Sequence, residues 1–220
     1  MVRRKSNGRI VSMAFVVPSL DKVPCCFTAL AVAPLPDALD LKSDTRHLKP
    51  CLSSEPMPYT PIVATLGYVL TPDRRSVLLI HRNARSDDAH LGKYNGLGGK
   101  LEPNEDVVTG MRRELREEAA IEALTLTLRG TVSWPGFGPQ GEAWLGFLFV
   151  ITHFRGEPLA RNPEGTLTWE PVARLLAGAL PLWPGDHHFL PLVFSPDPRQ
   201  FHGVMPYRDG QPVSWHYTLI

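Results

Sequence analysis

The chain has 220 residues, 43% of them hydrophobic, which is enough for one well-buried domain with an extension. Lysine and arginine total 23 against 22 acidic residues, and a net charge of +1 argues against binding a nucleic acid polymer or a membrane through bulk charge. No apolar run reaches the roughly 18 residues that a membrane-spanning helix needs. We therefore expect a soluble domain.

The first 60 residues are rich in proline and lack periodicity, so we expect residues 1–60 to be a disordered extension and residues 61–220 to be the folded domain. Basic residues near the N-terminus give it some features of a targeting peptide. A loose tail, or a true start at Met57, are the alternatives we favour. The cysteines are odd in number and match no metal spacing, which favours a reducing compartment, the cytoplasm: Cys25, Cys26 and Cys51.

The remaining elements alternate between strand and helix patterns. A strand is expected at 62–70, followed after a short turn by a second at 76–82 and then by a hydrophilic loop at 83–94. A helix is expected at about 104–119, and two long strands at 124–134 and 143–154. A short helical segment is expected at 169–180, and two C-terminal segments that pair with each other at 200–207 and 214–220. This order predicts an α/β domain with a mixed sheet.

Asn104 is the candidate N-cap of the first helix, and the acids Glu105 and Asp106 suit the positive end of its dipole. At 100° per residue, four apolar side chains share one arc that can pack on the sheet: Val108, Met111, Leu115 and Ala119.

Three acids on the adjoining arc, Glu114, Glu117 and Glu118, are expected to project toward one spot. Like charges at this spacing weaken a helix by a few tenths of a kcal/mol per pair, so something must offset their cost. Gly110 falls within the acidic arc, where the missing side chain would let a ligand approach. Arg113 can pair with Glu117 one turn later. Taken alone, the interleaved charges would fit an ordinary solvated helix face.

The spacing of the whole stretch argues against that ordinary face. It runs Gly99, five residues, Glu105, seven residues, Arg113-Glu114-Leu115, one residue, Glu117-Glu118, one residue, Ala120-Ile121. This resembles the Nudix box of the Nudix hydrolases, with Ala120 in place of the family's glycine. The resemblance implies the Nudix fold, a mixed β-sheet sandwiched between α-helices. If residue 120 takes the left-handed conformation that glycine tolerates, alanine costs about 1 kcal/mol there.

The resemblance also implies chemistry. Nudix enzymes cleave a nucleoside diphosphate linked to another moiety, with Mg²⁺ or Mn²⁺ neutralising the phosphates and polarising a water. It implies that Glu105 braces the loop, that Arg113 orients a ligand carboxylate and that Glu164 lies near the metal. The implied metal ligands are the carbonyl of Gly99 and the side chains of Glu114, Glu117 and Glu118, and which glutamate serves as base stays open.

Residues 60–219 also resemble the oxidised purine nucleoside triphosphate diphosphatases, the animal-type relatives of MutT, through "KYNGLGGKLEPNE", "LPLWPGDHHFLPLVF" and "FHGVMPYRDGQPVSWHYTL". The resemblance places Asn95, Trp183 and Asp186 in a base pocket, where an indole stacks on a purine and polar groups bind its edge. This sequence departs from the pattern of those enzymes at residue 185, where it has glycine and they carry a second acid. Two lysines are candidates for phosphate contacts: Lys93 and Lys100.

From the sequence we therefore expect a monomeric, Mg²⁺-dependent diphosphatase that converts an oxidised purine nucleoside triphosphate such as 8-oxo-dGTP to the monophosphate and pyrophosphate, and so cleanses the nucleotide pool. One alternative is a Nudix hydrolase of another nucleotide, such as ADP-ribose or a dinucleoside polyphosphate. The other is a Nudix-fold module that senses a nucleotide without cleaving it, although a pure binder has no need of three glutamates.

Overall fold

The computed structural model describes residues 58–220. The disorder expected of residues 1–60 falls almost wholly outside the described residues and stays a prediction. The strands are β1 Ile62–Leu70, β2 Ser76–His81, β3 Tyr94–Asn95, β4 Glu122–Trp134, β5 Trp144–Arg155, β6 Arg161–Asn162, β7 Gly165–Pro171, β8 Phe201–Val204, β9 Tyr207–Arg208, β10 Gln211–Pro212 and β11 His216–Leu219. The helices are α1 Val107–Ala119, α2 Val172–Leu176 and α3 Asp186–Val193. None of the helices in the described part is long and apolar enough to cross a membrane.

Nine strands form one mixed sheet in the order β11-β8-β4-β5-β1-β2-β7-β6, with β3 paired to β2. The pairs β1–β5 and β4–β8 are parallel and the other pairs are antiparallel. Strands β9 and β10 form a separate hairpin. The predicted mixed sheet is confirmed.

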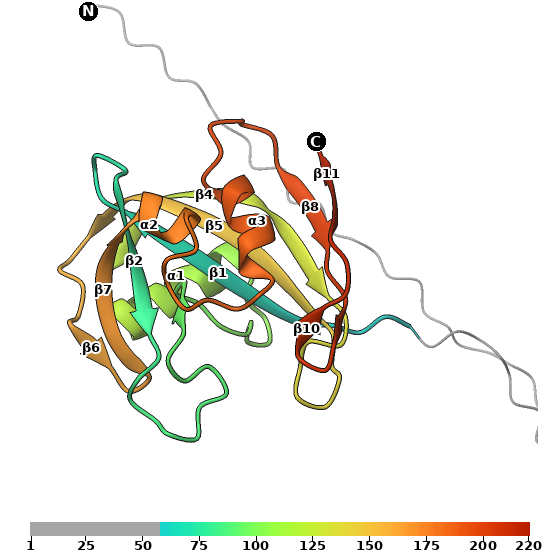
Figure 1. Cartoon of the computed structure of the whole chain (residues 1–220). Coiled ribbons are helices and arrows are strands. Elements are labelled where there is room, and N and C mark those ends of the chain that lie inside the picture. The colour runs from blue at the N-terminus through green and yellow to red at the C-terminus, as the bar shows by residue number, and fades with distance from the viewer. Residues whose placement is uncertain (1–57) are drawn as a thin grey trace, which may run out of the picture. The chain divides into compact units, whose positions relative to one another are not determined.

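Helices cover both faces of this sheet: α1 lies on one face, and α2 and α3 lie on the other (Figure 1). Successive strand side chains alternate between the two faces, as a pleated sheet requires. Tyr68 and Leu70 of β1 join the core beneath α2 and α3, whereas Val69 between them joins the core beneath α1. The predicted sandwich of a sheet between helices is therefore confirmed.

Most expected strands are confirmed, and the C-terminal segments pair as predicted, β8 with β11, with the β9–β10 hairpin between them. Strand β7 and helix α3 were not predicted. Helix α3 contains Pro191, which usually argues against a helix but is accommodated in this short one. The segment 169–180 becomes helical only at Val172, because its first residues complete β7.

Helix α1 begins later than predicted. Asp106 is its N-cap, and one carboxylate oxygen accepts from the amides of Val108 and Thr109 at 2.8 and 3.0 Å. Asn104, the predicted cap, instead takes a positive φ of 71° in the preceding turn. At the other end Ala120 has φ 55° and ψ 31°, the left-handed conformation anticipated for that position.

Gly110 serves packing, which corrects the expectation that it admits a ligand. It is buried, and a Cβ there would collide with the Leu101 side chain and lie 3.0 Å from Oε1 of Glu105. The missing side chain makes room for the loop that precedes α1.

That loop runs along β1 because β1 and β2 pair over only two residue pairs before they diverge. Gly67 and Leu97 exchange both backbone hydrogen bonds, at 2.6 and 3.0 Å, and the amide of Thr65 donates to the carbonyl of Gly99 at 2.8 Å. A side chain at residue 98 would collide with the Thr65 carbonyl, and the φ of Gly98 is +141°. The loop thereby brings Gly98 and Gly99 beside the acidic face of α1.

Candidate active site

Arg113 organises the acidic face of α1. Its Nη2 and Nε lie 2.6 and 3.1 Å from the two carboxylate oxygens of Glu105, and its Nη1 lies 2.9 Å from Glu114 and 3.1 Å from Glu117. The predicted pairing with Glu117 is confirmed. Nη2 also donates to the carbonyl of Lys100 at 3.1 Å. One guanidinium thus joins the loop to the helix, and Glu105 braces this junction.

Glu118 faces away from Arg113 into the protein. One of its carboxylate oxygens accepts from the amide of Gly98 at 2.8 Å. Burial, together with repulsion from Glu164 and Glu114, raises the pKa of Glu118 to about 8. Burial also raises the pKa of Glu114, against the opposing effect of Arg113. Carboxylates in such surroundings are stabilised as anions when a cation is added.

The three glutamates share one face of α1, but their side chains do not converge as expected. Arg113 holds Glu114 and Glu117, while Glu118 turns to the Gly98 amide. Within residues 58–220, no three His, Cys, Asp or Glu side chains gather in a metal-binding geometry. The assignment of metal ligands therefore stays a prediction.

Gly99 lies next to these acids. A Cβ on residue 99 would stand 2.6 Å from Oε1 of Glu114, so any other residue would push this carboxylate away. The Gly99 carbonyl accepts a hydrogen bond from the Thr65 amide. Its oxygen has a second lone pair that can bind another partner. Hard divalent cations prefer carboxylate and carbonyl oxygens, and the predicted ligands Gly99, Glu114, Glu117 and Glu118 supply only these.

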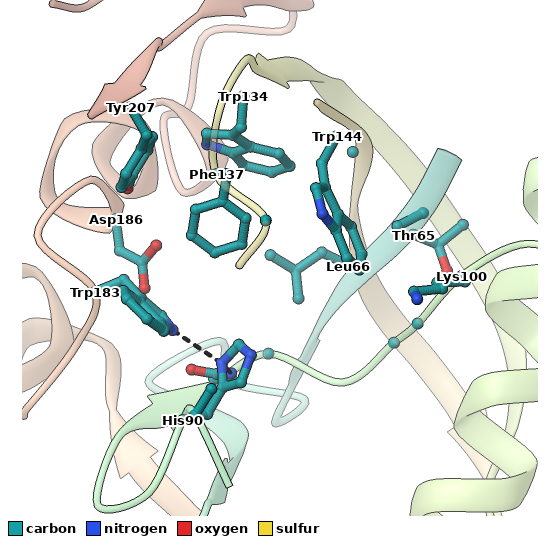
Figure 2. Close-up of a pocket in the computed structure, with 18 of the residues that line it drawn as sticks. Thr65, Leu66, His90, Lys100, Trp134, Phe137, Trp144, Trp183, Asp186 and Tyr207 are labelled. Carbon is teal, nitrogen blue, oxygen red and sulfur yellow. Dashed lines mark hydrogen bonds between the residues drawn. The ribbon is translucent and has the colours of Figure 1, made fainter. Parts of the chain in front are cut away.

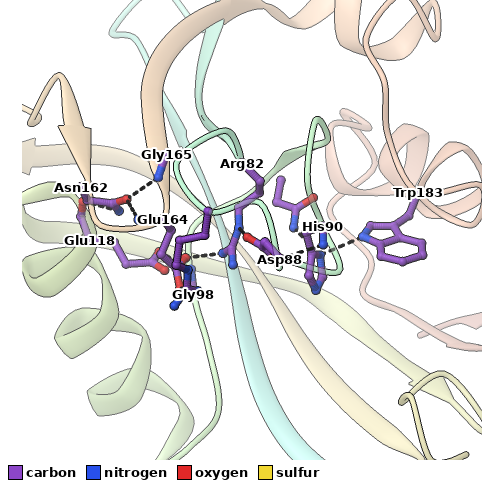
Figure 3. Close-up of polar contacts among 11 residues, drawn as sticks. Arg82, Asp88, His90, Gly98, Glu118, Asn162, Glu164, Gly165 and Trp183 are labelled. Atoms are coloured by element: carbon purple, nitrogen blue, oxygen red, sulfur yellow. Dashed lines mark hydrogen bonds and ion pairs between the residues drawn. The ribbon is translucent and has the colours of Figure 1, made fainter.

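Glu164 reaches the same region from the turn between β6 and β7 (Figure 3). Asn162 forms this turn by accepting from the amide of Glu164 at 2.9 Å, and its own amide donates to the carbonyl of Glu118 at 3.1 Å. The Glu164 carboxylate pairs with Arg82 and lies 3.8 Å from Arg85. The structure thus brings Glu164 near Glu118, and its predicted place beside a metal stays a prediction. The structure also adds Arg82, which sequence reasoning missed.

A cavity of about 850 Å³ extends from these acids to an aromatic end (Figure 2). Glu118, Glu164 and Gly99 line one part, and Asn95, Trp183 and Asp186 line another, so these six predicted site residues share one space. Glu114 and Glu117 are not among the described residues that line it. Additional aromatic rings around the cavity were not predicted: Trp134, Phe137, Trp144, Phe189 and Tyr207. In the sequence, Trp134, Phe137 and Trp144 lie in or beside the glycine-rich segment 136–141, which was an available signal, whereas Phe189 and Tyr207 are distant from it.

The two candidate lysines differ. Lys100 lines the cavity, with its Nζ 5.2 Å from the ring centre of Trp144. Lys93 is not among the described residues that line it. Its Nζ instead lies over the indole of Trp183 at 4.8 Å and donates to the carbonyl of Leu182 at 3.3 Å. A cation over an indole face supports the position of the ring, so the predicted phosphate contact of Lys93 does not fit this geometry.

Asp186 opens α3, and its carboxyl group points toward the cavity (Figure 2). Burial raises its pKa to about 7, against the lowering effect of a backbone hydrogen bond and of Lys93. Burial and the charge of Asp186 raise the pKa of Tyr207 to about 12. A side chain on Gly185 would collide with the Tyr207 hydroxyl and the Met205 sulfur, so the phenol occupies the space that a second acid at residue 185 would need.

Comparisons with known proteins agree with this geometry. A family model described as the NUDIX domain matches residues 60–193. An oxidized purine nucleoside triphosphate hydrolase from Mus musculus is 30% identical over 68% of this chain and 88% of its own length. An uncharacterized Nudix hydrolase from Bacillus subtilis is 32% identical over 60% of this chain and 78% of its own. The crystal structure of a mutator MutT protein from Bacillus halodurans is 28% identical and covers 71% of this chain and 97% of its own, with a TM-score of 0.60.

The fold and the site define a hydrolase that acts on phosphoric anhydride bonds. The chain belongs to the Nudix family, and its relatives include MutT-like proteins. Nudix hydrolases generally use divalent metals, which fits the all-oxygen donors on α1 and its preceding loop.

Proposed function

We propose that this protein is a Mg²⁺-dependent diphosphatase of oxidised purine nucleoside triphosphates, such as 8-oxo-dGTP, and that it cleanses the nucleotide pool of the cytoplasm. The products are the nucleoside monophosphate and pyrophosphate. The observation that carries the proposal is the single cavity that joins the partly buried carboxylates of Glu118 and Glu164 to an aromatic end with a carboxyl group, because a nucleotide needs both environments at once. The similarity to the mouse oxidized purine nucleoside triphosphate hydrolase supports the same substrate class.

At the acidic end, the side chains of Glu114, Glu117 and Glu118 with the carbonyl of Gly99 would hold Mg²⁺, and Mn²⁺ is expected to substitute. The bound cation would neutralise phosphate charge and polarise a water. Arg113 fixes Glu114 and Glu117, and the Gly98 amide fixes Glu118. Since these contacts hold the three carboxylates in different directions, Mg²⁺ would have to draw them toward one point as it binds.

At the aromatic end, the indole of Trp183 would stack on the base. The carboxyl group of Asp186 would bind N–H donors on the base edge. Oxidation converts N7 of a purine from an acceptor to an N–H donor, so a site with a matched acceptor can discriminate strongly between the two forms.

The first test is chromatographic product analysis with Mg²⁺ and five classes of substrate: 8-oxo-dGTP, 2-hydroxy-dATP, the normal dNTPs, ADP-ribose and diadenosine tetraphosphate. Preferred release of an oxidised monophosphate and pyrophosphate is the expected result. If only another substrate is cleaved, the assignment as a hydrolase would stand and the proposed base pocket would be rejected. Nucleotide binding without any cleavage would favour a sensor.

Two variants test the assigned ends of the cavity separately. Glu117→Gln removes a charged ligand at an exposed position of α1 and is expected to abolish turnover without unfolding the protein. Trp183→Ala is expected to raise KM for the preferred nucleotide. An active Glu117→Gln enzyme would overturn the metal assignment, and an unchanged KM in Trp183→Ala would overturn the base pocket.

A further inference from the structure

His90 lies at the meeting point of the polar contacts at the base end of the cavity (Figure 3). Its Nδ1 lies 2.9 Å from the indole nitrogen of Trp183 and 3.0 Å from Nδ2 of Asn95. An indole N–H can only donate a hydrogen bond. Nδ1 of His90 is therefore the acceptor, its one lone pair is shared by the indole N–H and the Asn95 NH₂ group, and the proton of the neutral ring is on Nε2. Burial, together with Arg82 and Lys93, lowers the pKa of His90, which favours this neutral form.

The state of His90 determines how the Asn95 amide is oriented. Because Nδ1 accepts, the group of Asn95 that faces it is the NH₂ group, and Oδ1 points the other way. Oδ1 is buried and has no hydrogen-bond partner within the described part of the chain. Asn95 lines the cavity. A buried acceptor without a partner costs about 1–3 kcal/mol, and an N–H donor on a ligand removes that cost.

His90 is itself held in place. Asp88 accepts from the backbone amide of His90 at 2.9 Å through one oxygen and from Nε of Arg82 at 2.7 Å through the other. The Arg82 and Asp88 side chains are only 13% and 5% exposed, so water competes little for these contacts. Arg82 then pairs with Glu164 at the acidic end. A continuous chain of contacts thus fixes the backbone of His90, and its imidazole lies at the edge of the Trp183 ring, with the two ring planes at 79°.

We propose that His90 is a positioning residue: it fixes Asn95 as a hydrogen-bond acceptor and Trp183 as a stacking surface, so the cavity selects bases that present an N–H donor to residue 95. This inference rests on the proposed function. It narrows the substrate class to nucleotides whose base carries an amine or ring N–H at that edge. A base edge that carries only acceptors could not form a hydrogen bond with Oδ1 of Asn95, because both groups would be acceptors.

The test compares His90→Asn with His90→Phe. An asparagine amide oxygen can replace the Nδ1 acceptor, whereas phenylalanine keeps a ring of similar size and cannot accept. By calorimetry with 8-oxo-dGMP, we expect His90→Phe to bind about 10-fold or more weakly, as loss of an oriented acceptor implies, and His90→Asn to stay within about 3-fold of the wild type. In turnover, KM should rise in His90→Phe with little change in kcat. His153→Phe, at an exposed histidine of β5, is the control.

A second readout needs no nucleotide. The indole N–H resonance of Trp183, assigned with Trp183→Phe, should shift in His90→Phe because its hydrogen bond is lost, and should stay near its original position in His90→Asn. An unchanged resonance and unchanged affinity in His90→Phe would overturn the proposal, as would equal weakening in both variants. If wild-type protein binds no oxidised purine nucleotide, the proposed function fails, while the indole resonance still decides whether His90 positions Trp183.

Discussion

Arg113 and Glu105 form a two-point ion pair, with Nη2 2.6 Å from one carboxylate oxygen and Nε 3.1 Å from the other. Glu105 also accepts from the amide of Glu102 at 2.7 Å, so the pair ties the loop before α1 to the helix. This ion pair leaves Nη1 facing Glu114 and Glu117. Hydrogen bonding to Glu105, and to a lesser extent to Glu114 and Glu117, raises the pKa of Arg113 well above its usual value.

Replacing Arg113 with lysine should lower kcat/KM by about 10- to 100-fold, because an ammonium keeps the charge but cannot make the forked contact that orients several carboxylates. Arg112→Lys, on the exposed side of the same helix, is the matched control and should remain near wild type. Steady-state kinetics with circular dichroism would separate this effect from misfolding. Wild-type activity in Arg113→Lys would show that the forked contact is dispensable.

Ala120→Gly should stabilise the protein by about 0.5–1 kcal/mol. Ala120 has φ 55°, where a Cβ is unfavourable, and glycine removes that cost while adding some entropy to the unfolded chain. The measurement is the midpoint of urea unfolding.

The control for this prediction is Ala177→Gly. Ala177 closes α2 with φ −74°, where alanine is unstrained, so glycine should destabilise by up to about 1 kcal/mol. The two alanine-to-glycine substitutions are thus expected to change the free energy of unfolding in opposite directions. A loss of stability in Ala120→Gly would refute the strain argument.

Asp186→Asn should change how stability depends on pH. The folded protein raises the pKa of Asp186 from its usual 3.8 to about 7, so it binds this proton more tightly than the unfolded chain. The resulting stabilisation is fully present below pH 3.8 and is lost as the pH rises through about 7. Asparagine cannot ionise, so the Tm of Asp186→Asn relative to wild type should increase between pH 4 and pH 8.

Glu118 also makes the folded protein less stable as the pH rises, because folding raises its pKa from 4.5 to about 8. Asp186→Asn should therefore remove only part of the pH dependence, and the measurement should be made in EDTA so that bound metal does not alter Glu118. Parallel curves of Tm against pH for the two proteins would contradict the assignment of a raised pKa to Asp186.

Arg129→Met should destabilise the protein by about 2–4 kcal/mol, since it leaves four buried or partly buried carbonyls without this donor. Arg129 extends from β4 and is 8% exposed. It donates to four carbonyls at and beyond the end of α3, those of Leu192, Val193, Ser195 and Asp197. Arg199→Met is the control, because Arg199 is exposed and pairs only with Asp197 among the described residues, and it should cost no more than about 0.5 kcal/mol. Equal unfolding midpoints for the two variants would rule out this role of Arg129.

The sequence predicted which residues share the acidic face of α1, because local periodicity controls this, but it did not predict the directions of the three carboxylates. Helical spacing places Glu114, Glu117 and Glu118 on one face of α1, and the Arg113–Glu117 pair follows from a one-turn separation. The left-handed conformation of Ala120 also follows from a local comparison of glycine with alanine. The start of α1 was less predictable, because Asn104 and Asp106 are both good capping residues and the turn geometry decides between them.

The aromatic end of the cavity, where we propose that the base binds, depends on contacts between distant segments, which periodicity does not reveal. His90 lies in a hydrophilic loop, and its role emerges only when the loop is docked against Trp183, 93 residues later in the chain. The orientation of the Glu118 carboxylate likewise depends on the Gly98 amide, 20 residues earlier. Helix α3 was missed because Pro191 masked a helical pattern.

The sheet separates the supports of the two ends. Helix α1 rests on one core and α3 on the other, and no buried side chain within residues 58–220 belongs to both. Changes beneath α3 can therefore reshape the aromatic end of the cavity without disturbing the packing of α1, which carries Glu114, Glu117 and Glu118. Because the two cores are separate, a duplicated gene copy could acquire a new nucleotide preference through changes on the α3 face of the sheet. The hydrolytic chemistry supported by the α1 face would be retained.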